Sequence, residues 1–273
     1  MTRTLVLGGT GTTGGRVVDR LAALGLPVRI GSRTAEPPFD WRREATWMPA
    51  LRGVDAVYLA FQPHLAAPGA ANAVRAFAGA AAMAGVRRLV LLSCRGEAGA
   101  LAAEQAVRQS SVPWTIVRAA WFDQDFSEGY LYDSVLAGEV ALPVRPVGEP
   151  FVDAGDIADV AVAALTDERH AGRLYEVTGP RLLTFAEAVE ELSEATGRRI
   201  RYERITVDEW TAQLSVPDDV AWLLAHLYTD VLDGRNARIG DGVQRALGRE
   251  PRDFAEFAQA AAATGVWSIG RVG

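Results

Sequence analysis

The sequence predicts a doubly wound α/β fold that carries a smaller, mainly helical C-terminal lobe. Glycines separate a strand-like run from a helix-like run near the start, and strand-like and helix-like segments then alternate up to about residue 120. Beyond that point, helices with recognisable caps predominate. Alternation of this kind is typical of a parallel sheet with helices on both faces. We therefore expect residues 1–150 to form a Rossmann domain and residues 151–273 to form the lobe, with some segments of the lobe returning to the sheet.

The first strand and helix enclose a glycine-rich turn. The chain reads Gly8-Gly-Thr-Gly-Thr-Thr-Gly14 between an apolar run at 4–7 and a helix expected at 13–24. A turn without Cβ atoms lets the main chain approach a pyrophosphate, and the N-terminus of the helix binds its charge. The spacing G-x-x-G-x-x-G is a weak motif by itself, but its place between strand and helix favours a dinucleotide over an ordinary turn. No Gly-Lys-Ser/Thr follows, which excludes a P-loop.

The end of the second strand, expected at 27–30, indicates which dinucleotide binds. A site for NAD usually places Asp or Glu here, whereas an NADP site places a cation. This chain has Ser32 and Arg33. The Arg33 guanidinium can pair with a 2′-phosphate and stack on adenine, and Ser32 can donate its hydroxyl. NADP(H) is therefore favoured over NAD(H).

The alternation continues after the second strand. We expect strands at 39–41, 55–61, 88–93 and 114–117, with helices at 70–84 and 101–109. Near-continuous apolar strands indicate a parallel sheet that is covered on both faces. The carboxyl ends of three of these strands, at 59–63, 92–94 and 118–122, should surround the nicotinamide half of the dinucleotide.

Helix caps mark the lobe. Thr184 with Glu187 and Thr206 with Glu209 have the spacing of capping boxes, and a strand at 201–204 lies between them. Pro217 is expected to begin a long helix with one apolar face that Gly234 ends. A final helix is expected after residue 251.

Composition excludes several classes of protein. A net charge of −6 argues against general affinity for nucleic acid or an anionic membrane. The single cysteine, Cys94, cannot form an intramolecular disulfide and fits a reducing cytoplasm, and the start of the chain lacks the pattern of a signal peptide. The alanine-rich segment 65–86 contains Pro68 and Arg75, so we interpret it as a helix of a globular protein. The histidines and Cys94 are scattered, so no metal site is expected.

The chain resembles the NmrA-like, atypical short-chain dehydrogenase/reductases over most of its length. Within that family it is most similar to the quinone reductases and to the iminium reductases of ergot-alkaloid pathways. The resemblance rests on Gly8–Gly14, Ser32-Arg33, Phe39-Asp40-Trp41, Val90–Ser93, Glu104-Gln105, Arg118 with Trp121-Phe122, Phe151–Ala158 and Tyr175–Thr184.

The resemblance implies roles for particular residues around NADP(H). It places Thr10, Gly11, Thr12 and Thr13 on the pyrophosphate, Arg33 on the 2′-phosphate and Asp40 near adenine. It also places two loops along the ribose and nicotinamide. The residues of these loops are Ala60, Phe61, Gln62, Ser93 and Cys94.

The acid of ordinary short-chain dehydrogenases is missing. These enzymes protonate the substrate with a Tyr whose pKa is lowered by a nearby Lys, but the segment 95–112 contains neither. Ala100 stands where related quinone reductases carry Lys or His, and Arg118-Ala119 replaces the usual Arg-Pro. Either the site works without an enzyme acid, or the protein does not catalyse.

Quinones and iminium ions accept hydride readily, so a site that only holds two planar rings together suffices for them. The expected aromatic walls are Trp121, Phe122, Phe126, Tyr130, Trp222 and Tyr228. An acidic patch at Asp123, Asp125 and Glu128 is explained equally well by attraction of a cation, by proton relay or by a solvated helix start. His64, His170 and His226 are more simply explained as solvent-exposed or structural residues.

The sequence leaves three functions open. The leading hypothesis is an NADPH-dependent reductase of a planar conjugated electrophile, most simply a quinone or an aromatic polyketide, with an iminium ion as the alternative substrate. The second is a non-catalytic NADP(H)-sensing regulator, and the third is an isomerase or dehydratase without net redox change. The oligomeric state remains open.

Overall fold

The computed structural model describes residues 3–213 and 218–268, which fall into two compact units. Unit 1 comprises Met1–Ala119, Ala154–Val177 and Gly240–Glu250, and unit 2 comprises Ala120–Asp153, Thr178–Ile239 and Pro251–Gly273. Beyond the boundary expected at residue 150, Ala154–Val177 and Gly240–Glu250 belong to unit 1, and residues 120–150 before it belong to unit 2. The chain returns to unit 1 because the last strand of its sheet comes late in the sequence.

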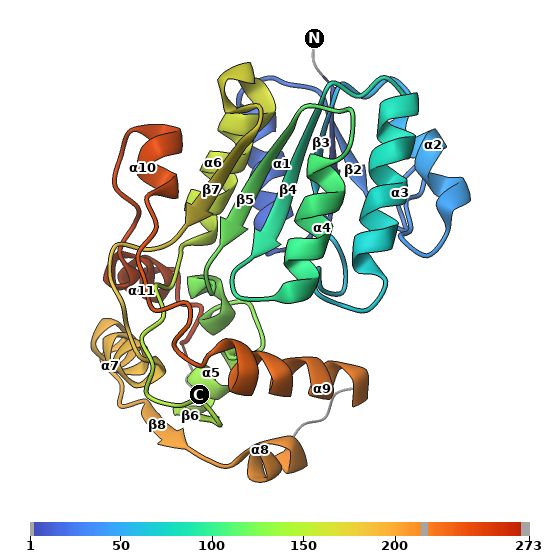
Figure 1. Cartoon of the computed structure of the whole chain (residues 1–273). Helices are drawn as coiled ribbons and strands as arrows, with labels where there is room; N and C mark the ends of the chain where they lie inside the picture. The colour runs from blue at the N-terminus through green and yellow to red at the C-terminus, as the bar shows by residue number, and fades with distance from the viewer. Residues whose placement is uncertain (1–2, 214–217, 269–273) are drawn as a thin grey trace. The chain divides into compact units, whose positions relative to one another are not determined.

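Unit 1 contains a parallel sheet of six strands in the order β2-β1-β3-β4-β5-β7 (Figure 1). Every neighbouring pair is parallel. This topology confirms the doubly wound fold. The strands are β1 (Thr4–Leu7), β2 (Val28–Gly31), β3 (Ala56–Leu59), β4 (Arg88–Cys94), β5 (Trp114–Ala119) and β7 (Arg173–Val177).

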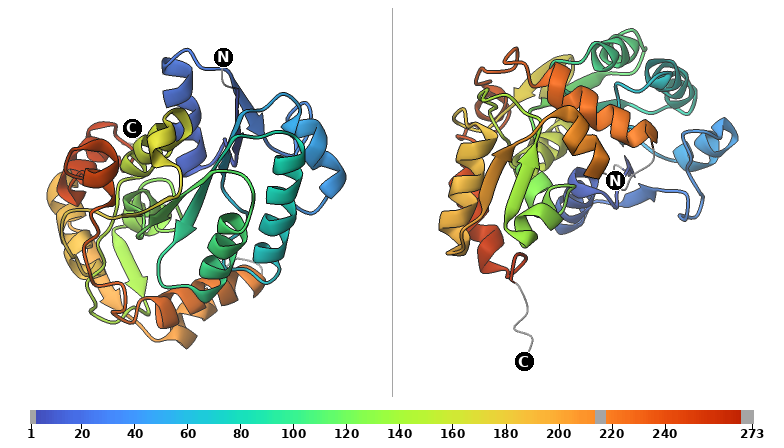
Figure 2. Two further views of the ribbon diagram at one scale, coloured as in Figure 1. Left: turned by 45° about the horizontal axis from the view of Figure 1, so that its top comes forward. Right: turned by 90° about the horizontal axis from the view of Figure 1, so that it is seen from below.

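Helices cover both faces of this sheet. Figure 1 and Figure 2 show α1 and α6 together on one face, and α3 and α4 together on the other. Both faces of the inner strands are therefore buried, which explains their unbroken apolar sequence. The helical elements of unit 1 are α1 (Thr12–Ala23), η1 (Glu44–Thr46), α2 (Trp47–Leu51), α3 (Ala70–Met83), α4 (Ala98–Arg108), α6 (Ala154–Thr166), η3 (Glu168–His170) and α10 (Gly242–Leu247).

The strand expected at 39–41 is absent, and that prediction is wrong. Local contacts satisfy the backbone there: the Phe39 N–H donates to the Ser32 carbonyl at 2.8 Å, and the Asp40 carbonyl accepts from Trp47 Nε1 at 3.0 Å. Phe39 and Trp41 pack edge to face, with ring centroids 5.1 Å apart. The aromatic residues that suggested a strand thus belong to a packed loop.

Unit 2 combines helices with a small parallel sheet in which β6 pairs with β8. Its core is rich in aromatic side chains, among them Phe126, Phe151, Phe185 and Phe254. The elements of unit 2 are η2 (Asp123–Phe126), α5 (Tyr132–Ala137), β6 (Glu139–Leu142), α7 (Phe185–Thr196), β8 (Arg201–Arg204), α8 (Val207–Gln213), α9 (Asp218–His226), η4 (Leu227–Val231) and α11 (Phe254–Ala263).

Both capping boxes predicted from the sequence are present. Thr184 Oγ1 accepts from the Glu187 N–H, and Thr206 Oγ1 accepts from the Glu209 N–H, each at 3.2 Å. Pro217, expected to begin the long helix, lies outside the described residues. That helix is α9, which passes directly into the π-helical turn η4.

Within the described residues, no helix combines the length and the apolar character that crossing a membrane requires. The alanine-rich segment forms α3, which packs in the core of unit 1.

Candidate cofactor and substrate site

The glycine turn brings the end of β1 close to the start of α1. Gly8 has a φ of +69°, and the Gly11 N–H donates to the Gly8 carbonyl at 2.9 Å. A Cβ atom on Gly14 would lie 2.2 Å from the Gly8 oxygen. Only glycine at position 14 allows the helix to begin this close to the strand.

The first turn of α1 is suited to an anion. Its N-cap residue, Gly11, supplies no side-chain hydrogen bond, and the first turn contains no acidic residue. Thr10 is exposed and Thr12 is partly exposed, whereas Thr13 is buried and accepts a hydrogen bond from the Tyr58 hydroxyl at 3.0 Å. An uncapped helix start with its positive dipole end is a common phosphate site.

The loop after β3 lies beside the glycine turn. A Cβ on Gly8 would be 3.4 Å from Ala60 Cβ and 3.8 Å from Gln62 Nε2. The strand order makes this a switch point, since β2 lies on one side of β1 and β3 lies on the other. Phe61, also expected along the cofactor, packs against Trp41 with ring centroids 4.7 Å apart.

The residues expected near the adenosine half gather after β2. The bond from the Phe39 N–H to the Ser32 carbonyl brings Asp40 near the end of this strand. Asp40 Oδ1 accepts from the Arg42 N–H at 2.9 Å. Arg33 is exposed and forms no ion pair with any residue in the described part of the chain. Its guanidinium is therefore available for a phosphate.

Ser93 and Cys94, at the end of β4, both interact with other side chains of the protein, which the sequence does not predict. Ser93 is buried, and its hydroxyl donates to Glu104 Oε1 at 2.7 Å. Burial, together with the nearby Glu97 carboxylate, raises the pKa of the Cys94 thiol well above its usual value. The Cys94 thiol is therefore neutral and unreactive at physiological pH.

Glu104 is the centre of a buried charge network. Arg118 donates to both of its carboxylate oxygens, and Arg118 Nη1 also donates to Glu176 Oε1 at 3.0 Å. The bond to Glu104 raises the pKa of Arg118. The sequence identifies Glu104 and Arg118 only as parts of the family pattern and does not predict that they pair, because the two lie on different elements.

The structure brings together three groups that had seemed scattered. Ligand atoms of His64, Cys94 and Glu97 all lie within 4.8 Å of one another, and His64 Nε2 is 3.6 Å from Glu97 Oε1. The Ala66 N–H donates to His64 Nδ1 at 3.3 Å, so the neutral ring carries its proton on Nε2. Both His64 Nε2 and the Cys94 thiol would have to lose a proton to bind a metal ion.

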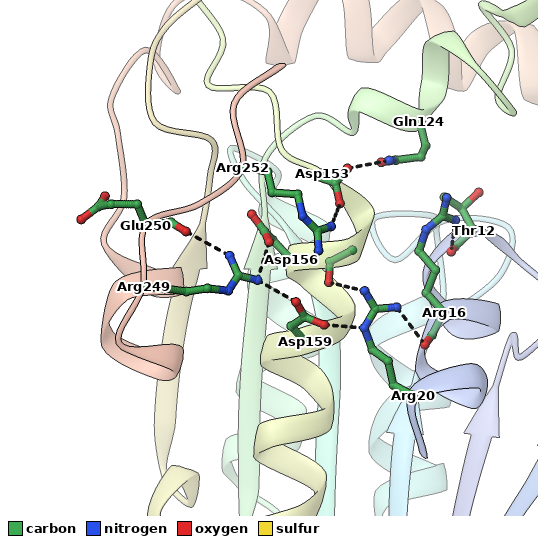
Figure 3. A network of polar contacts seen from close by, with 11 residues as sticks. Thr12, Arg16, Arg20, Gln124, Asp153, Asp156, Asp159, Arg249, Glu250 and Arg252 are labelled. Atoms are coloured by element: carbon green, nitrogen blue, oxygen red, sulfur yellow. Dashed lines mark hydrogen bonds and ion pairs between the residues drawn. The ribbon is translucent and has the colours of Figure 1, made fainter. Parts of the chain in front are cut away.

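The motif at 151–158 also serves the structure. In unit 1, Figure 3 shows Arg249 between the α6 carboxylates Asp156 and Asp159, with Arg20 of α1 also on Asp159. Arg249 Nη2 lies 2.7 Å from Asp156 Oδ1 and 2.6 Å from Asp159 Oδ2. In unit 2, the motif residue Asp153 accepts from Arg252 Nη1 at 2.7 Å.

Three of the expected substrate residues gather in unit 2, where Trp121 stacks on Tyr228 and Tyr130 lies edge-on to both. Phe126 and Tyr228 are both almost fully buried in the unit 2 core, so of these three gathered residues only Trp121 and Tyr130 reach a surface. Phe122 is partly buried. The backbone of Trp222 belongs to α9, but its side chain lies outside the described residues.

The two remaining histidines have local partners. His170 is buried, and its Nδ1 lies 2.8 Å from the Tyr175 hydroxyl. His226 Nδ1 lies 3.0 Å from Asp230 Oδ2. Both contacts agree with the structural roles expected for these residues.

A doubly wound sheet with a glycine turn at its switch point defines a dinucleotide-binding protein. A family model described as NAD(P)H-binding matches residues 8–168. The chain belongs to this NAD(P)H-binding family, and it is an NAD(P)H-dependent oxidoreductase.

Several relatives match nearly the whole chain. An uncharacterized oxidoreductase, YesF, of Bacillus subtilis is 35% identical, with 97% of each chain covered. The NAD(P)H azoreductase of Xenophilus azovorans is 34% identical over 95% of this chain and 98% of its own. Agroclavine dehydrogenase of Claviceps fusiformis is 32% identical over 93% of this chain and 95% of its own.

Solved structures share the fold. The Citrobacter sp. triphenylmethane reductase complexed with NADP(H) superposes with a TM-score of 0.76 at 22% identity, covering 95% of this chain and 99% of its own. An Escherichia coli NADPH-dependent quinone oxidoreductase complexed with NADPH gives 0.76 at 20% identity, covering 94% and 99%. At this level of identity the likeness establishes the fold alone.

Proposed function

We propose that this protein is an NADPH-dependent reductase of planar conjugated electrophiles such as quinones, azo compounds, aromatic polyketides, iminium ions and cationic aromatic dyes. The observation that carries the proposal is the glycine turn of unit 1, where a Cβ on Gly14 would collide with the Gly8 carbonyl. The names of its azoreductase and dehydrogenase relatives support the substrate class.

The preference for NADPH rests on the end of β2. The Gly8–Gly14 turn and Thr10, Thr12 and Thr13 would hold the pyrophosphate. The exposed Arg33, with Ser32 beside it, would hold the 2′-phosphate, and Asp40 would lie near adenine. The loops at 60–62 and 93–94 would lie along the ribose and nicotinamide. When bound, NADPH supplies a hydride with two electrons and is left as NADP⁺.

Trp121 and its aromatic neighbours in unit 2 would contact the substrate. A flat electrophile gains contact area and orientation from aromatic side chains, and orientation is the main requirement when the acceptor is already reactive. The chain has one cysteine, whose thiol is neutral, and this is consistent with a cytoplasmic enzyme. Its net negative charge is consistent with an enzyme that acts on small molecules.

The test is turnover by the purified protein. NADPH oxidation is followed with a quinone, a monoazo dye, a cyclic iminium compound and a cationic triarylmethane dye, with NADPH binding measured separately by calorimetry. Oxidation that depends on both protein and acceptor supports the proposal. Tight NADPH binding without turnover of any acceptor would contradict it and would favour the NADP(H)-sensing regulator.

A further inference from the structure

The chain contains no lysine, so any acid in its active site has to be built differently from a tyrosine–lysine pair. Four of its six tyrosine hydroxyls already have partners in the described residues, away from any carboxylate. These bonds are Tyr58 to Thr13, Tyr132 to the Val266 carbonyl, Tyr175 to His170 and Tyr202 to the Val144 carbonyl. Tyr130 and Tyr228, both in unit 2, are the two that remain.

Tyr130 is the tyrosine that faces a carboxylate. Its hydroxyl donates to Asp125 Oδ2 at 3.5 Å, and the residue as a whole is 43% exposed. Asp125 belongs to η2, and the turn that follows brings Tyr130 back against it. A phenol beside a carboxyl group can pass one proton outward and take another from behind.

Asp125 is suited to hold that proton. Burial raises its pKa to about 7, and the charge of Glu128 acts in the same direction. The groups that face it are Glu128 on its own segment, Tyr130 and the Tyr228 hydroxyl of η4. The carboxyl group can therefore keep its proton to a higher pH than an ordinary aspartic acid.

One further donor nearby points to a ligand. Trp121 Nε1 is buried and finds no hydrogen-bond partner among the described residues, whereas the buried Tyr228 hydroxyl interacts with the Tyr130 hydroxyl. The rings of Trp121 and Tyr228 stack with centroids 5.5 Å apart at 26°. A buried donor without a partner is unfavourable, because it has given up its hydrogen bond to water. A planar ligand with an oxygen or nitrogen acceptor would satisfy this donor.

We propose that Tyr130 is the acid of this reductase, that Asp125 is its proton source, and that the pair acts on electrophiles whose reduced form carries charge on oxygen or nitrogen. The inference rests on the proposed function. Once an electrophile has accepted hydride, the new electron pair on its heteroatom takes the Tyr130 O–H proton. The phenolate oxygen then takes the Asp125 carboxyl proton. A proton from water restores the Asp125 carboxyl group.

This assignment separates two kinds of substrate. Hydride addition to an azo bond leaves an anionic nitrogen that needs a proton. Hydride addition to the central carbon of a cationic triarylmethane dye gives a neutral product that needs none. Loss of the acid therefore affects the azo compound far more than the cationic dye, whereas loss of an aromatic wall affects both.

The experiment compares Tyr130→Phe and Asp125→Asn with the unaltered protein, using a monoazo dye and a cationic triarylmethane dye with NADPH. Tyr130→Phe should lower kcat for the azo dye by about 100-fold or more, and kcat for the cationic dye by only a few-fold. Asp125→Asn should also lower the azo rate and abolish its decline above about pH 7. Tyr132→Phe, a matched change in unit 2, should leave both rates as they are.

Equal losses for the two dyes in Tyr130→Phe, or an unchanged pH profile in Asp125→Asn, would overturn the assignment. These outcomes differ from failure of the proposed function, in which the unaltered protein reduces neither dye.

Discussion

Arg118 holds the carboxylate of Glu104 with two hydrogen bonds, from Nε to Oε1 at 2.8 Å and from Nη2 to Oε2 at 2.6 Å. Glu104 is 2% exposed and also accepts the Ser93 hydroxyl. The pair joins α4 to β5 just where β4 and β5 end. It thereby fixes the edge of the sheet that is expected to hold the nicotinamide half of the cofactor.

Removal of Glu104 should be strongly destabilising. Glu104→Ala leaves the Arg118 guanidinium without its main partner, and breaking a buried pair from one side costs about 3–5 kcal/mol. Urea denaturation measures the loss. The control is Glu139→Ala, which breaks the exposed pair with Arg201 and should cost less than about 1 kcal/mol. Equal losses in the free energy of unfolding for the two changes would show that the Glu104 network contributes no more to stability than an exposed ion pair.

The glycine turn offers a matched pair of substitutions. Gly14→Ala places a Cβ 2.2 Å from the Gly8 oxygen, whereas Gly15→Ala places one 3.8 Å from the Gly9 oxygen, an ordinary contact. Gly14→Ala should weaken NADPH binding at least about tenfold, because the turn has to open. Gly15→Ala should bind NADPH normally and gain up to about 1 kcal/mol of stability. Calorimetry measures the NADPH affinity of the two variants, and thermal unfolding measures their stability. Similar NADPH affinities would refute the idea that the main chain of the glycine turn closely contacts the pyrophosphate.

Cofactor choice depends on Arg33. Arg33→Ala should weaken NADPH binding by about 1.5–3 kcal/mol, because charged hydrogen bonds to the 2′-phosphate are lost, and should leave NADH binding nearly unchanged. The exposed Arg75 of α3 serves as the control, since Arg75→Ala should alter neither affinity. If the affinities for the two cofactors fall equally in Arg33→Ala, the 2′-phosphate assignment is wrong.

Asp125 makes the stability of the fold depend on pH. Its pKa is about 7 in the folded protein against an ordinary value of 3.8, so the folded state keeps the proton to higher pH than the unfolded chain. The contribution of this group to stability is fully present below the ordinary pKa and is lost as the pH rises through about 7. Asp125→Asn should therefore lose less stability than the unaltered protein between about pH 5 and pH 8.

Urea denaturation at several pH values tests this, with Asp241→Asn as a change at an exposed carboxylate. A pH dependence in Asp125→Asn that matches the unaltered protein would contradict the raised pKa.

The parts of the fold that the sequence predicts best are those with one dominant local cause. Strands β1, β3, β4 and β5 are short apolar runs buried on both faces, and the capping boxes of α7 and α8 depend only on residues three apart. Strand β7 escaped prediction because it lies at the edge of the sheet and mixes exposed Arg173 with buried Val177. Helix α6 was not predicted either. It is buried almost all round, so its sequence lacks the amphipathic pattern by which a helix is recognised.

Some parts of the candidate site could also be predicted from the sequence, and others could not. The glycine turn and Arg33 are contiguous with predicted elements, so their positions follow from the chain. The partnership of Glu104 with Arg118 joins separate elements, and that of Asp125 with Tyr130 depends on an irregular turn. Neither follows from hydrophobic periodicity, because tertiary packing creates the first contact and the conformation of the turn creates the second.

The most direct test of hydride transfer uses NADPH carrying deuterium at C4 of the nicotinamide and a cationic triarylmethane dye in a single turnover. Mass spectrometry of the colourless product is the measurement, with each C4 face labelled in turn. A reductase that transfers hydride directly places one deuterium on the central carbon from one face and none from the other. Product without deuterium from either face, or NADPH that stays unoxidised while the dye is bound, would contradict the proposed function.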